Sequence, residues 1–582
     1  MSGKIHILDD ELIGKIAAGE VVERPSSVVK ELVENSIDAG ADSIEVDINA
    51  AGESLIRVAD NGEGMTREDA KVSCMRHSTS KINDIEDLSR IFTLGFRGEA
   101  LSSIAAVSQV DITTRSSSER EATYLYIESG EAQKIRPAAR DKGTTVEVHN
   151  LFYNVPARRK FLKSKSTELA SITETVGRFA LSYPGIEFKL THEGRAILNI
   201  PRDMELRERV KAVLGGDVAD SMVEIDAAFD EFKIRGFVSQ PSCTRKDKRS
   251  QLFYVNKRYI RSKLLSDSLQ GAYRSLLERG RYPSSVLYID VDPQEVDVNI
   301  HPGKLLVKFG DEKRAREAIT QAVREKFERI KESSSREIAE SSVGREEAEA
   351  LGEKFSDTTE IQSEFKYEQK NEPDIEEKTL QEGTRSRPSL KKEVTGEKLF
   401  QIGKCYIAKI EDEKIVLYDQ HAAHERVLYE FFSNAKDARP AEVQNLLFPI
   451  RLDLAADESI IMEKLLDEFK MLGFNIELFG DNSYIVQGVP VVLKERDIKT
   501  VIFDILSDLD AITLSKTDPV DELVKITSCR AAIKAGDPLD EEEMSALINQ
   551  LFKCSLPFTC PHGRPTFYEI KIDEMEKWFR RT

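Results

Sequence analysis

A long polar segment divides this chain into two halves. Between residues 335 and 393 the sequence consists largely of Ser, Glu, Lys, Gln and Thr, and its few apolar residues follow no periodic pattern. Such a segment cannot bury enough apolar surface to offset the entropy lost on ordering it. We therefore expect a flexible, disordered linker over 333–394, which lets a C-terminal unit move while staying at high local concentration near the N-terminal half.

Length and composition bound the rest of the architecture. A chain of 582 residues exceeds what one hydrophobic core usually supports, so we expect folded units over 1–204, 205–332 and 395–582. Hydrophobic residues make up 40% of the chain and charged residues 32%, as in soluble globular proteins. No run approaches the roughly 20 apolar residues of a membrane span, and the first residues lack the apolar core of a signal peptide. We expect a cytoplasmic protein without membrane contact.

The charge distribution allows one half of the chain to bind DNA. The formal net charge of −19 argues against attraction of nucleic acid to the whole surface. Basic residues nevertheless cluster before residue 270, at 158–165, 245–249 and 257–263. If these clusters share a face, the N-terminal half can grip a phosphate backbone; if they do not, they are ordinary solvated charges.

One stretch near the N-terminus has the pattern of a functional helix. Residues 25–27 supply a start signal and Gly40 a stop, while apolar residues recur between them at helical spacing. Glu31, Asn35 and Asp38 follow one another at intervals of four and three, so they lie in one row on another side of the helix. That row can hold a hydrated cation and orient a water molecule; the alternative is a solvated polar face.

Two neighbouring strands are predicted after this helix. Apolar residues alternate over 44–48 and again over 56–58, and the second strand ends in Asp60-Asn61-Gly62-Glu63-Gly64. Asp60 continues the parity of the buried positions, and Gly62 and Gly64 let the backbone turn sharply against a ligand. An inward carboxylate here can accept a hydrogen bond from an amino group such as that of adenine.

A phosphate-binding loop is expected between residues 76 and 104. Glycine, hydroxyl and basic residues precede a helix predicted from about Glu99, and free amides at a helix start face an anion. The pattern is not that of the G-x-x-x-x-G-K-[ST] loop, so a different nucleotide fold is required. Residues 142–148 predict a turn and a strand on which Thr145 supports the base pocket.

In this order, the four blocks resemble the N-terminal ATPase of the GHKL superfamily. The sequence from Val21–Pro25 through Gly95–Leu101 is similar to those of the MutL family of DNA mismatch repair proteins in particular. The resemblance implies a Bergerat-type α/β sandwich that binds ATP and Mg²⁺, with Glu31 as general base, Asn35 as magnesium ligand and Asp60 as adenine contact. The further nucleotide-binding positions are Gly62, Gly64, Thr79, Lys81, Gly95, Phe96, Arg97, Gly98, Glu99, Ala100, Leu101 and Thr145. Residues 95–98 would belong to a lid over the phosphates.

A second α/β unit is predicted from about residue 205. Residues 253–258 indicate a strand and turn, 264–277 an amphipathic helix, and 286–291 a strand. A strand, a long helix and a strand favour a right-handed crossover in a small α/β domain. Residues 296–304 resemble the S5-like transducer domain of the same family, which implies that Lys304 reaches back to the terminal phosphate of ATP.

The C-terminal unit contains a candidate metal site. Residues 415–418 predict a strand that leads into a helix, and Asp419 lies where the helix begins. His421 and Glu425 are four residues apart, so they lie on one face of that helix. This is not H-E-x-x-H, which disfavours a metalloprotease. The six cysteines are too sparse for a disulfide scaffold, so we consider them as candidate metal ligands. Cys529 and the turn Cys560-Pro561-His562 complete a mixed N, S and O donor set that zinc accepts, and leave Asp419 for a second ion.

These C-terminal blocks resemble the metal-dependent endonuclease of those MutL family members that nick DNA themselves. The resemblance implies that Asp419 and Glu425 are essential for strand cleavage, with Zn²⁺, Mn²⁺ or both as the cofactor. The implied metal ligands are Asp419, His421, Glu425, Cys529, Cys560 and His562. One departure is Ser528, where the family usually has alanine before the Cys-Arg pair; the change leaves the ligand intact.

The same resemblance implies partners. Gln444–Pro449 is similar to the peptide by which bacterial repair proteins bind the sliding clamp; the alternative is a loop that enters a strand. We further expect a homodimer that acts on DNA at the nucleoid together with the mismatch sensor MutS. ATP binding would close the N-terminal domains on each other, and the C-terminal α/β dimerisation and endonuclease domains would hold the pair together.

Three other classes of protein compete with this interpretation. A type II topoisomerase needs a cleavage tyrosine and an acidic metal domain; Asp290-Val291-Asp292 imitates a D-x-D, but it lies inside the predicted transducer strand. A histidine kinase needs a phosphoacceptor helix ahead of the ATPase, which starts almost at residue 1. A non-enzymatic matchmaker with the same ATPase lacks the C-terminal metal ligands, so their presence in the sequence weighs against it.

Overall fold

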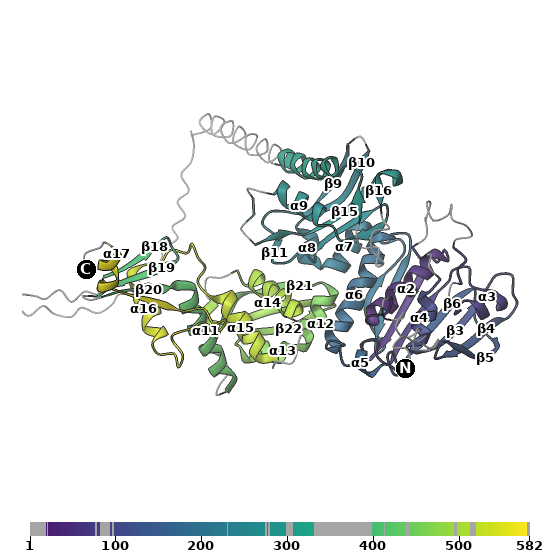
Figure 1. The fold of residues 1–582 in the computed structure, drawn as a ribbon, viewed down its shortest axis with the longest axis horizontal. Coiled ribbons are helices and arrows are strands. Elements are labelled where there is room, and N and C mark those ends of the chain that lie inside the picture. The colour runs from purple at the N-terminus through teal and green to yellow at the C-terminus, as the bar shows by residue number, and fades with distance from the viewer. Residues whose placement is uncertain are drawn as a thin grey trace, which may run out of the picture.

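The computed structural model contains three successive α/β regions (Figure 1). It describes residues 19, 21–75, 78–81, 94–95, 98–229, 231–273, 276–277, 280–297, 307–330, 398–411, 414–437, 441–493, 497–512 and 519–578. The predicted linker over 333–394, the lid residues Phe96 and Arg97, and Lys304 lie outside the described residues. Among the described helices, none is both long and apolar enough to cross a membrane.

The first region is a two-layer α/β sandwich. Its eight-stranded sheet has the order β5-β4-β3-β6-β2-β1-β7-β8, and among its pairings only that of β1 with β7 is parallel. The strands are β1 Ser43–Asn49, β2 Leu55–Asp60, β3 Gln109–Arg115, β4 Ala122–Glu128, β5 Glu131–Ala138, β6 Gly143–His149, β7 Glu187–His192 and β8 Arg195–Ile200. The helical elements are α2 Pro25–Asp38, η1 Ala50–Gly52, α3 Arg67–Val72, α4 Ala100–Ala106, α5 Pro156–Arg159 and α6 Lys165–Ser182. Side chains of α2 and α6 share one hydrophobic core with the sheet.

Local sequence explains why α2 and its neighbouring strands form. Pro25 occupies the first helical turn, where its missing N–H costs nothing, and the helix ends at Asp38, two residues before Gly40. The predicted stripe is buried at Val29, Leu32 and Val33. In β1 and β2 the buried positions alternate, as predicted. Because α2 lies over this buried face, its remaining polar row stands beside the end of β2.

The second region is a five-stranded sheet with the order β13-β12-β15-β10-β9. Its elements are α7 Leu206–Leu214, α8 Gly216–Asp220, β9 Met222–Phe229, β10 Phe232–Ser239, β11 Thr244–Arg245, β12 Gln251–Val255, β13 Arg258–Ile260, α9 Lys263–Ala272, β14 Tyr282–Pro283, β15 Ser285–Asp290, η3 Pro293–Glu295, β16 Val296–Asp297, β17 Lys308–Phe309 and a helix over 312–330. β12 and β15 are parallel and α9 connects them, which confirms the predicted strand, helix and strand. The helix is shorter than predicted, because the backbone leaves the helix after Ala272.

The third region carries two sheets. The four-stranded sheet, ordered β18-β19-β20-β24, consists of β18 Lys398–Ile402, β19 Tyr406–Ile410, β20 Lys414–Asp419 and β24 Phe567–Lys571. The three-stranded sheet, ordered β21-β23-β22, consists of β21 Val443–Asp453, β22 Asn475–Gly480 and β23 Ser483–Pro490. The helical elements are α11 Gln420–Asp437, α12 Ala456–Lys464, α13 Leu466–Met471, η4 Val491–Leu493, α14 Ile498–Ile512, α15 Pro519–Ala531, α16 Glu541–Leu551 and α17 Ile572–Trp578. Figure 1 shows α12 beside α6, so this region lies against the first.

Candidate functional site

The polar row on α2 faces a basic side chain from the loop after α3. Lys81 Nζ donates to Asn35 Oδ1 at 2.8 Å and to Asp38 Oδ2 at 2.5 Å. Glu31, one turn earlier, accepts from Lys30 Nζ at 2.9 Å. Lys30 also pairs with Glu34 at 3.0 Å, and the two carboxylates raise the pKa of its ammonium above the usual value although burial opposes this. The carboxylate, amide and second carboxylate therefore line one partly buried strip of the helix.

Asp38 also holds the start of the predicted phosphate loop. Its carboxylate accepts from the backbone amides of Leu94 at 2.9 Å and Gly95 at 3.1 Å. Further along, Glu99 is the residue before α4, so this helix begins at Ala100, one residue later than predicted. On the other side of the loop, Thr79 Oγ1 accepts from the amide of Lys81 at 3.2 Å. The loop and the polar row of α2 are thus joined mainly through the Asp38 carboxylate, with a further bond from Lys81 to Asn35.

The Asp60 carboxylate lies at the inner end of β2, as its parity predicted. Ser36 Oγ donates to its Oδ2 at 2.9 Å, and the amides of Gly62 and Thr144 donate to its Oδ1 at 2.9 and 3.1 Å. Burial raises the pKa of Asp60 above its usual value, while these three hydrogen bonds favour the ionised form. A buried carboxylate held in this way is an oriented acceptor for a ligand's amino group.

Close backbone packing surrounds this carboxylate. Gly64 has a φ of +70°, and a Cβ atom there would lie 2.1 Å from the carbonyl oxygen of Arg115. Only glycine fits such a position. Arg140 donates through Nη2 to the Asp60 carbonyl at 2.7 Å and through Nε to Thr145 Oγ1 at 3.0 Å. Thr145 therefore stands on strand β6, as predicted, and contacts Arg140 there.

Sequence reasoning missed two side chains here. Ser36 lies at helical spacing from the apolar residues of α2, and a hydroxyl on such a buried face requires a polar partner. Arg140 lies 80 positions from Asp60 in the chain, and no local pattern points to their contact. Both side chains orient the groups that the sequence did single out.

In the C-terminal region the predicted ligands converge on Glu425. His421, Glu425 and Cys529 have ligand atoms within 4.8 Å of one another, and so do Glu425, Cys560 and His562. Glu425 belongs to both groups and its side chain is only 3% exposed. His421 and Glu425 come from α11, Cys529 comes from α15, and His562 comes from the loop after α16. Segments far apart in the chain thus form one mixed nitrogen, sulfur and oxygen donor set of the kind that zinc accepts.

Hydrogen bonds orient the members of this cluster. His421 Nδ1 lies 2.9 Å from the carbonyl oxygen of Ile533, so this nitrogen carries the proton and Nε2 is left as the ligand atom. Cys560 is held in its turn by a 2.8 Å bond from its amide to the Arg564 carbonyl. His562 Nδ1 lies 2.9 Å from Glu425 Oε1.

The electrostatics of the cluster suit a cation. Burial by itself would raise the pKa of Glu425, but the two thiols and the imidazole around it hold that pKa below its usual value. Burial and the Glu425 charge raise the pKa of the Cys529 thiol to about 12, and burial also raises that of Cys560. A divalent cation bound beside this anionic carboxylate would favour the thiolate forms of the two cysteines, which are the forms that ligate metals.

Asp419 stands at the border of this cluster. It is the last residue of β20, and its Oδ1 accepts from the amide of Ala422 at 2.9 Å, in the first turn of α11. It belongs to neither group of ligands around Glu425.

The clamp-like segment lies within β21. Gln444–Pro449 spans a shift of register between Asn445 and Ile450, and there the strand departs from its partner β23. The side chains of Leu447 and Phe448 are 88% and 79% exposed. Two large apolar residues therefore project from an irregular strand into solvent.

Comparison with known proteins agrees with this geometry. Residues 23–151 match the family model described as histidine kinase-, DNA gyrase B- and HSP90-like ATPase, residues 210–328 that of the DNA mismatch repair protein C-terminal domain, and residues 399–539 that of the MutL C-terminal dimerisation domain. The sandwich fold and these family matches thus define an ATPase of the GHKL class joined to a dimerisation domain.

Full-length relatives make the family specific. The DNA mismatch repair proteins MutL of Syntrophotalea carbinolica and Bacillus anthracis are each 37% identical to the chain, with 100% of both sequences covered. That of Clostridium botulinum strain Kyoto is 34% identical over 99% of each. The chain belongs to the MutL family of DNA mismatch repair proteins.

Proposed function

We propose that this chain is an ATP-driven switch of mismatch repair that carries its own metal-dependent DNA endonuclease. The observation that supports the endonuclease is the convergence of two imidazoles and two thiols on the buried carboxylate of Glu425. A matchmaker that only recruits other nucleases has no need of such a donor set. The ATPase rests on the family and on the buried, hydrogen-bonded carboxylate of Asp60, which Ser36 joins to α2.

In the proposed ATPase cycle, Asp60 accepts a hydrogen bond from the adenine amino group while Glu31 orients the attacking water and accepts its proton. The amide oxygen of Asn35 is a suitable ligand for Mg²⁺, which would neutralise charge on the phosphates when bound. Lys81 now donates to that same oxygen, so it has to leave before Asn35 can ligate a metal. We expect it to move to a phosphate, and Lys304 to approach the terminal one.

The proposed lid follows from the bonds of Asp38. Since this carboxylate holds both Lys81 and the amides of residues 94 and 95, departure of Lys81 toward a nucleotide also frees the loop to reorganise. Gly95, Gly98 and the start of α4 at Ala100 and Leu101 then surround the phosphates together with Phe96 and Arg97. The loop thereby senses the nucleotide through one side chain of α2.

In the proposed endonuclease, His421, Glu425, Cys529, Cys560 and His562 hold Zn²⁺ or Mn²⁺, and Asp419 helps to hold a second ion. Such ions supply an activated water and stabilise the leaving oxygen. The chain's own contribution is to fix the ligands: Ile533 sets the tautomer of His421, and the 560–564 turn sets Cys560.

Two exposed apolar surfaces of the C-terminal region suit the proposed partners. The four-stranded sheet exposes Phe400, Ile402, Tyr406, Ile410 and Tyr568 by 48–65%, an apolar area suited to a second copy of the chain. Leu447 and Phe448 suit the pocket of the sliding clamp. We infer a functional connection to MutS, which senses the mismatch, from family membership.

A plasmid-nicking assay tests the endonuclease directly. Purified protein is incubated with supercoiled DNA in Mg²⁺, Mn²⁺ or Zn²⁺, and open-circle product is measured. We expect nicking in at least one metal, and loss of both nicking and bound metal in Cys560→Ala. A Cys554→Ala variant is the control, because Cys554 is a free thiol outside the Glu425 cluster. Equal nicking by wild type and Cys560→Ala would refute the assignment.

A further inference from the structure

The C-terminal region covers a basic cluster of the second region in this structure. Helix α12 lies against α6, and α14 contacts the connection between β11 and β12 through Asp508 and Lys246. Arg245 pairs with Glu458 at 3.1 Å and Arg281 with Asp504 at 2.6 Å. Lys246 pairs with Asp508. The cations come from residues 245–281, and the carboxylates all come from α12 and α14.

These ion pairs are largely removed from solvent. The side chains of Arg245 and Glu458 are 7% and 14% exposed, and those of Arg281 and Asp504 are 16% and 12% exposed. The Arg245 guanidinium also lies 3.9 Å from the centre of the Phe503 ring. Charges buried in this way are costly when their partner is lost, so the contact is specific rather than a loose collision.

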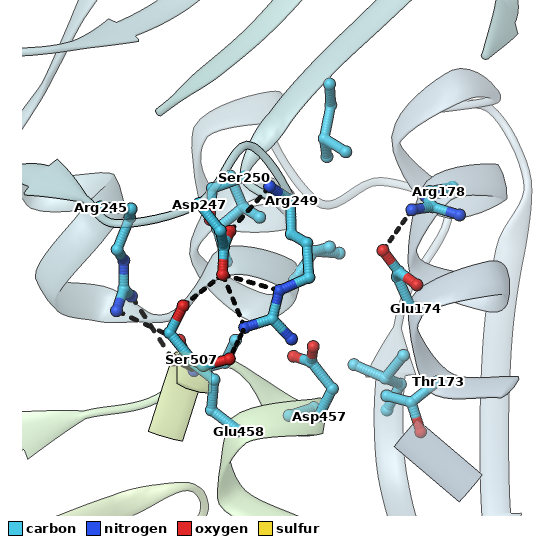
Figure 2. Close-up of a pocket in the computed structure, with 16 residues that line it drawn as sticks. Thr173, Glu174, Arg178, Arg245, Asp247, Arg249, Ser250, Asp457, Glu458 and Ser507 are labelled. Atoms are coloured by element: carbon cyan, nitrogen blue, oxygen red, sulfur yellow. Dashed lines mark hydrogen bonds and ion pairs between the residues drawn. The ribbon is translucent and has the colours of Figure 1, made fainter. Parts of the chain in front are cut away.

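Backbone and apolar contacts extend the same interface. In the second region Gly215 has a φ of +83°, and a Cβ atom there would lie 2.6 Å from the Asp453 carbonyl oxygen. Ala456, at the start of α12, is buried within the hydrophobic core of the first region. Figure 2 shows Asp247 and Arg249 turned toward Ser507, whose hydroxyl donates to Asp247. The two surfaces thus match in shape as well as in charge.

One pair has the opposite polarity. Lys499 of α14 donates to Asp217 of α8 at 2.7 Å. Lys499 belongs to the C-terminal region, so it is not part of the basic cluster. Its bond to Asp217 is a further contact between α14 and α8. Within the cluster, residues 245–249 with Arg281, the three cations Arg245, Lys246 and Arg281 pair with C-terminal carboxylates. Arg249 instead pairs with Asp247 and donates to the Ser507 carbonyl, and Lys248 pairs with Asp267.

We propose that this acidic face of α12 and α14 occupies the surface on which the N-terminal half binds a DNA phosphate backbone, so that docking of the C-terminal region and DNA binding exclude each other. This inference rests on the proposed action on DNA. Guanidinium and ammonium groups that now hold Glu458, Asp504 and Asp508 are the groups that pair with phosphates. DNA therefore binds the cluster only after the carboxylates leave.

The tethered acids are effective competitors because they are part of the same chain. Connection through one polypeptide gives them a high effective concentration, which DNA has to overcome by contacting several phosphates at once. Undocking by DNA also moves the Glu425 cluster away from the ATPase. The docked arrangement is thus a resting form in which the nuclease region is held until DNA takes its place.

Charge-reversal variants of the full-length chain test this competition. Asp504→Arg removes an acid of the docked face, Arg281→Asp removes its partner, and the double variant restores the pair with reversed polarity. Asp467→Arg makes the same change of charge at an exposed position of α13 and is the matched control. Small-angle X-ray scattering measures docking as the radius of gyration, and fluorescence anisotropy measures the dissociation constant for a mismatch-free duplex.

We expect Asp504→Arg to expand the chain and to bind the duplex about tenfold more tightly than Asp467→Arg, a change equivalent to one decade in Kd. Arg281→Asp should expand the chain and weaken DNA binding, and the double variant should be compact again. A compact Asp504→Arg chain, or an expanded one with the affinity of the control, overturns the proposal. Nicking and ATPase rates of the same samples are measured separately, so a failure of the proposed enzyme activities is distinguished from a failure of the competition.

Discussion

Ser36 Oγ donates a 2.9 Å hydrogen bond to Asp60 Oδ2 and thereby joins helix α2 to the end of strand β2. The same helix carries Glu31 and Asn35 on an adjacent side. The bond therefore holds the carboxylate that we assign to adenine in a fixed relation to the residues that we assign to the hydrolytic water and the metal. Recognition of the base and chemistry at the phosphates are coupled through one short helix.

Replacing Ser36 with alanine should weaken ATP binding. Loss of a hydrogen bond to a buried carboxylate costs about 1 kcal/mol, which corresponds to about a fivefold higher dissociation constant. Isothermal titration with a non-hydrolysable ATP analogue measures it. Ser268→Ala is the matched control, since Ser268 is also buried in a helix but donates only to the Leu264 carbonyl of that helix. The same loss of affinity in both variants would contradict the role of Ser36.

Glu31→Ala should bind ATP and fail to hydrolyse it. A positioned general base contributes at least about a hundredfold to such a reaction, so turnover should fall by that factor while nucleotide affinity stays the same. Phosphate release measures turnover. Glu34→Gln serves for comparison, because Glu34 pairs with the same lysine but lies outside the row of Glu31 and Asn35. Unchanged turnover in Glu31→Ala would remove its assignment as the base.

Asp419→Asn should abolish plasmid nicking and leave the ATPase rate unchanged. The substitution keeps the side-chain oxygen that caps the first turn of α11 but removes the negative charge that we assign to a metal ion. Open-circle product and phosphate release are measured on one preparation. Asp573→Asn, in the first turn of α17, provides a control of the same chemistry. Persistent nicking in Asp419→Asn would place the active site elsewhere.

Docking of the C-terminal region should weaken as pH rises from 6 to 8. Burial at the interface and the nearby charges of Glu458 and Glu174 raise the pKa of Asp457 to about 7, and Arg249 opposes this only in part. Asp457 and Arg178 of α6 line one pocket at this interface, and Arg178 is paired there with Glu174 (Figure 2).

The sign follows from the raised pKa. A carboxyl whose pKa is higher in the docked form favours docking while it is protonated, and this contribution is lost as pH rises through about 7. The radius of gyration should therefore increase between pH 6 and 8 in the wild-type chain and change less in Asp457→Asn. An equal increase in both chains would assign the effect to other groups.

Local sequence determined the elements that carry the site. The start signals at 25–27 and the apolar stripe of α2, the alternation of β1 and β2, and the strand that leads into α11 follow from side-chain periodicity, which acts over one or two turns. Even the inward direction of Asp60 follows from its parity in β2. Such features depend on neighbours in sequence, so a pattern of residue types is sufficient to predict them.

Tertiary structure alone decided which distant groups meet. Arg140 and Thr144 contact Asp60 although they lie 80 and 84 positions away in the sequence. Cys529 approaches Glu425 from another helix. The sequence alone left open whether the basic residues at 245–249 share a free face, yet Arg245 and Lys246 pair with acids of α12 and α14. Contacts of this kind depend on how whole layers pack, and that packing is set by the summed burial of many apolar residues rather than by any local signal.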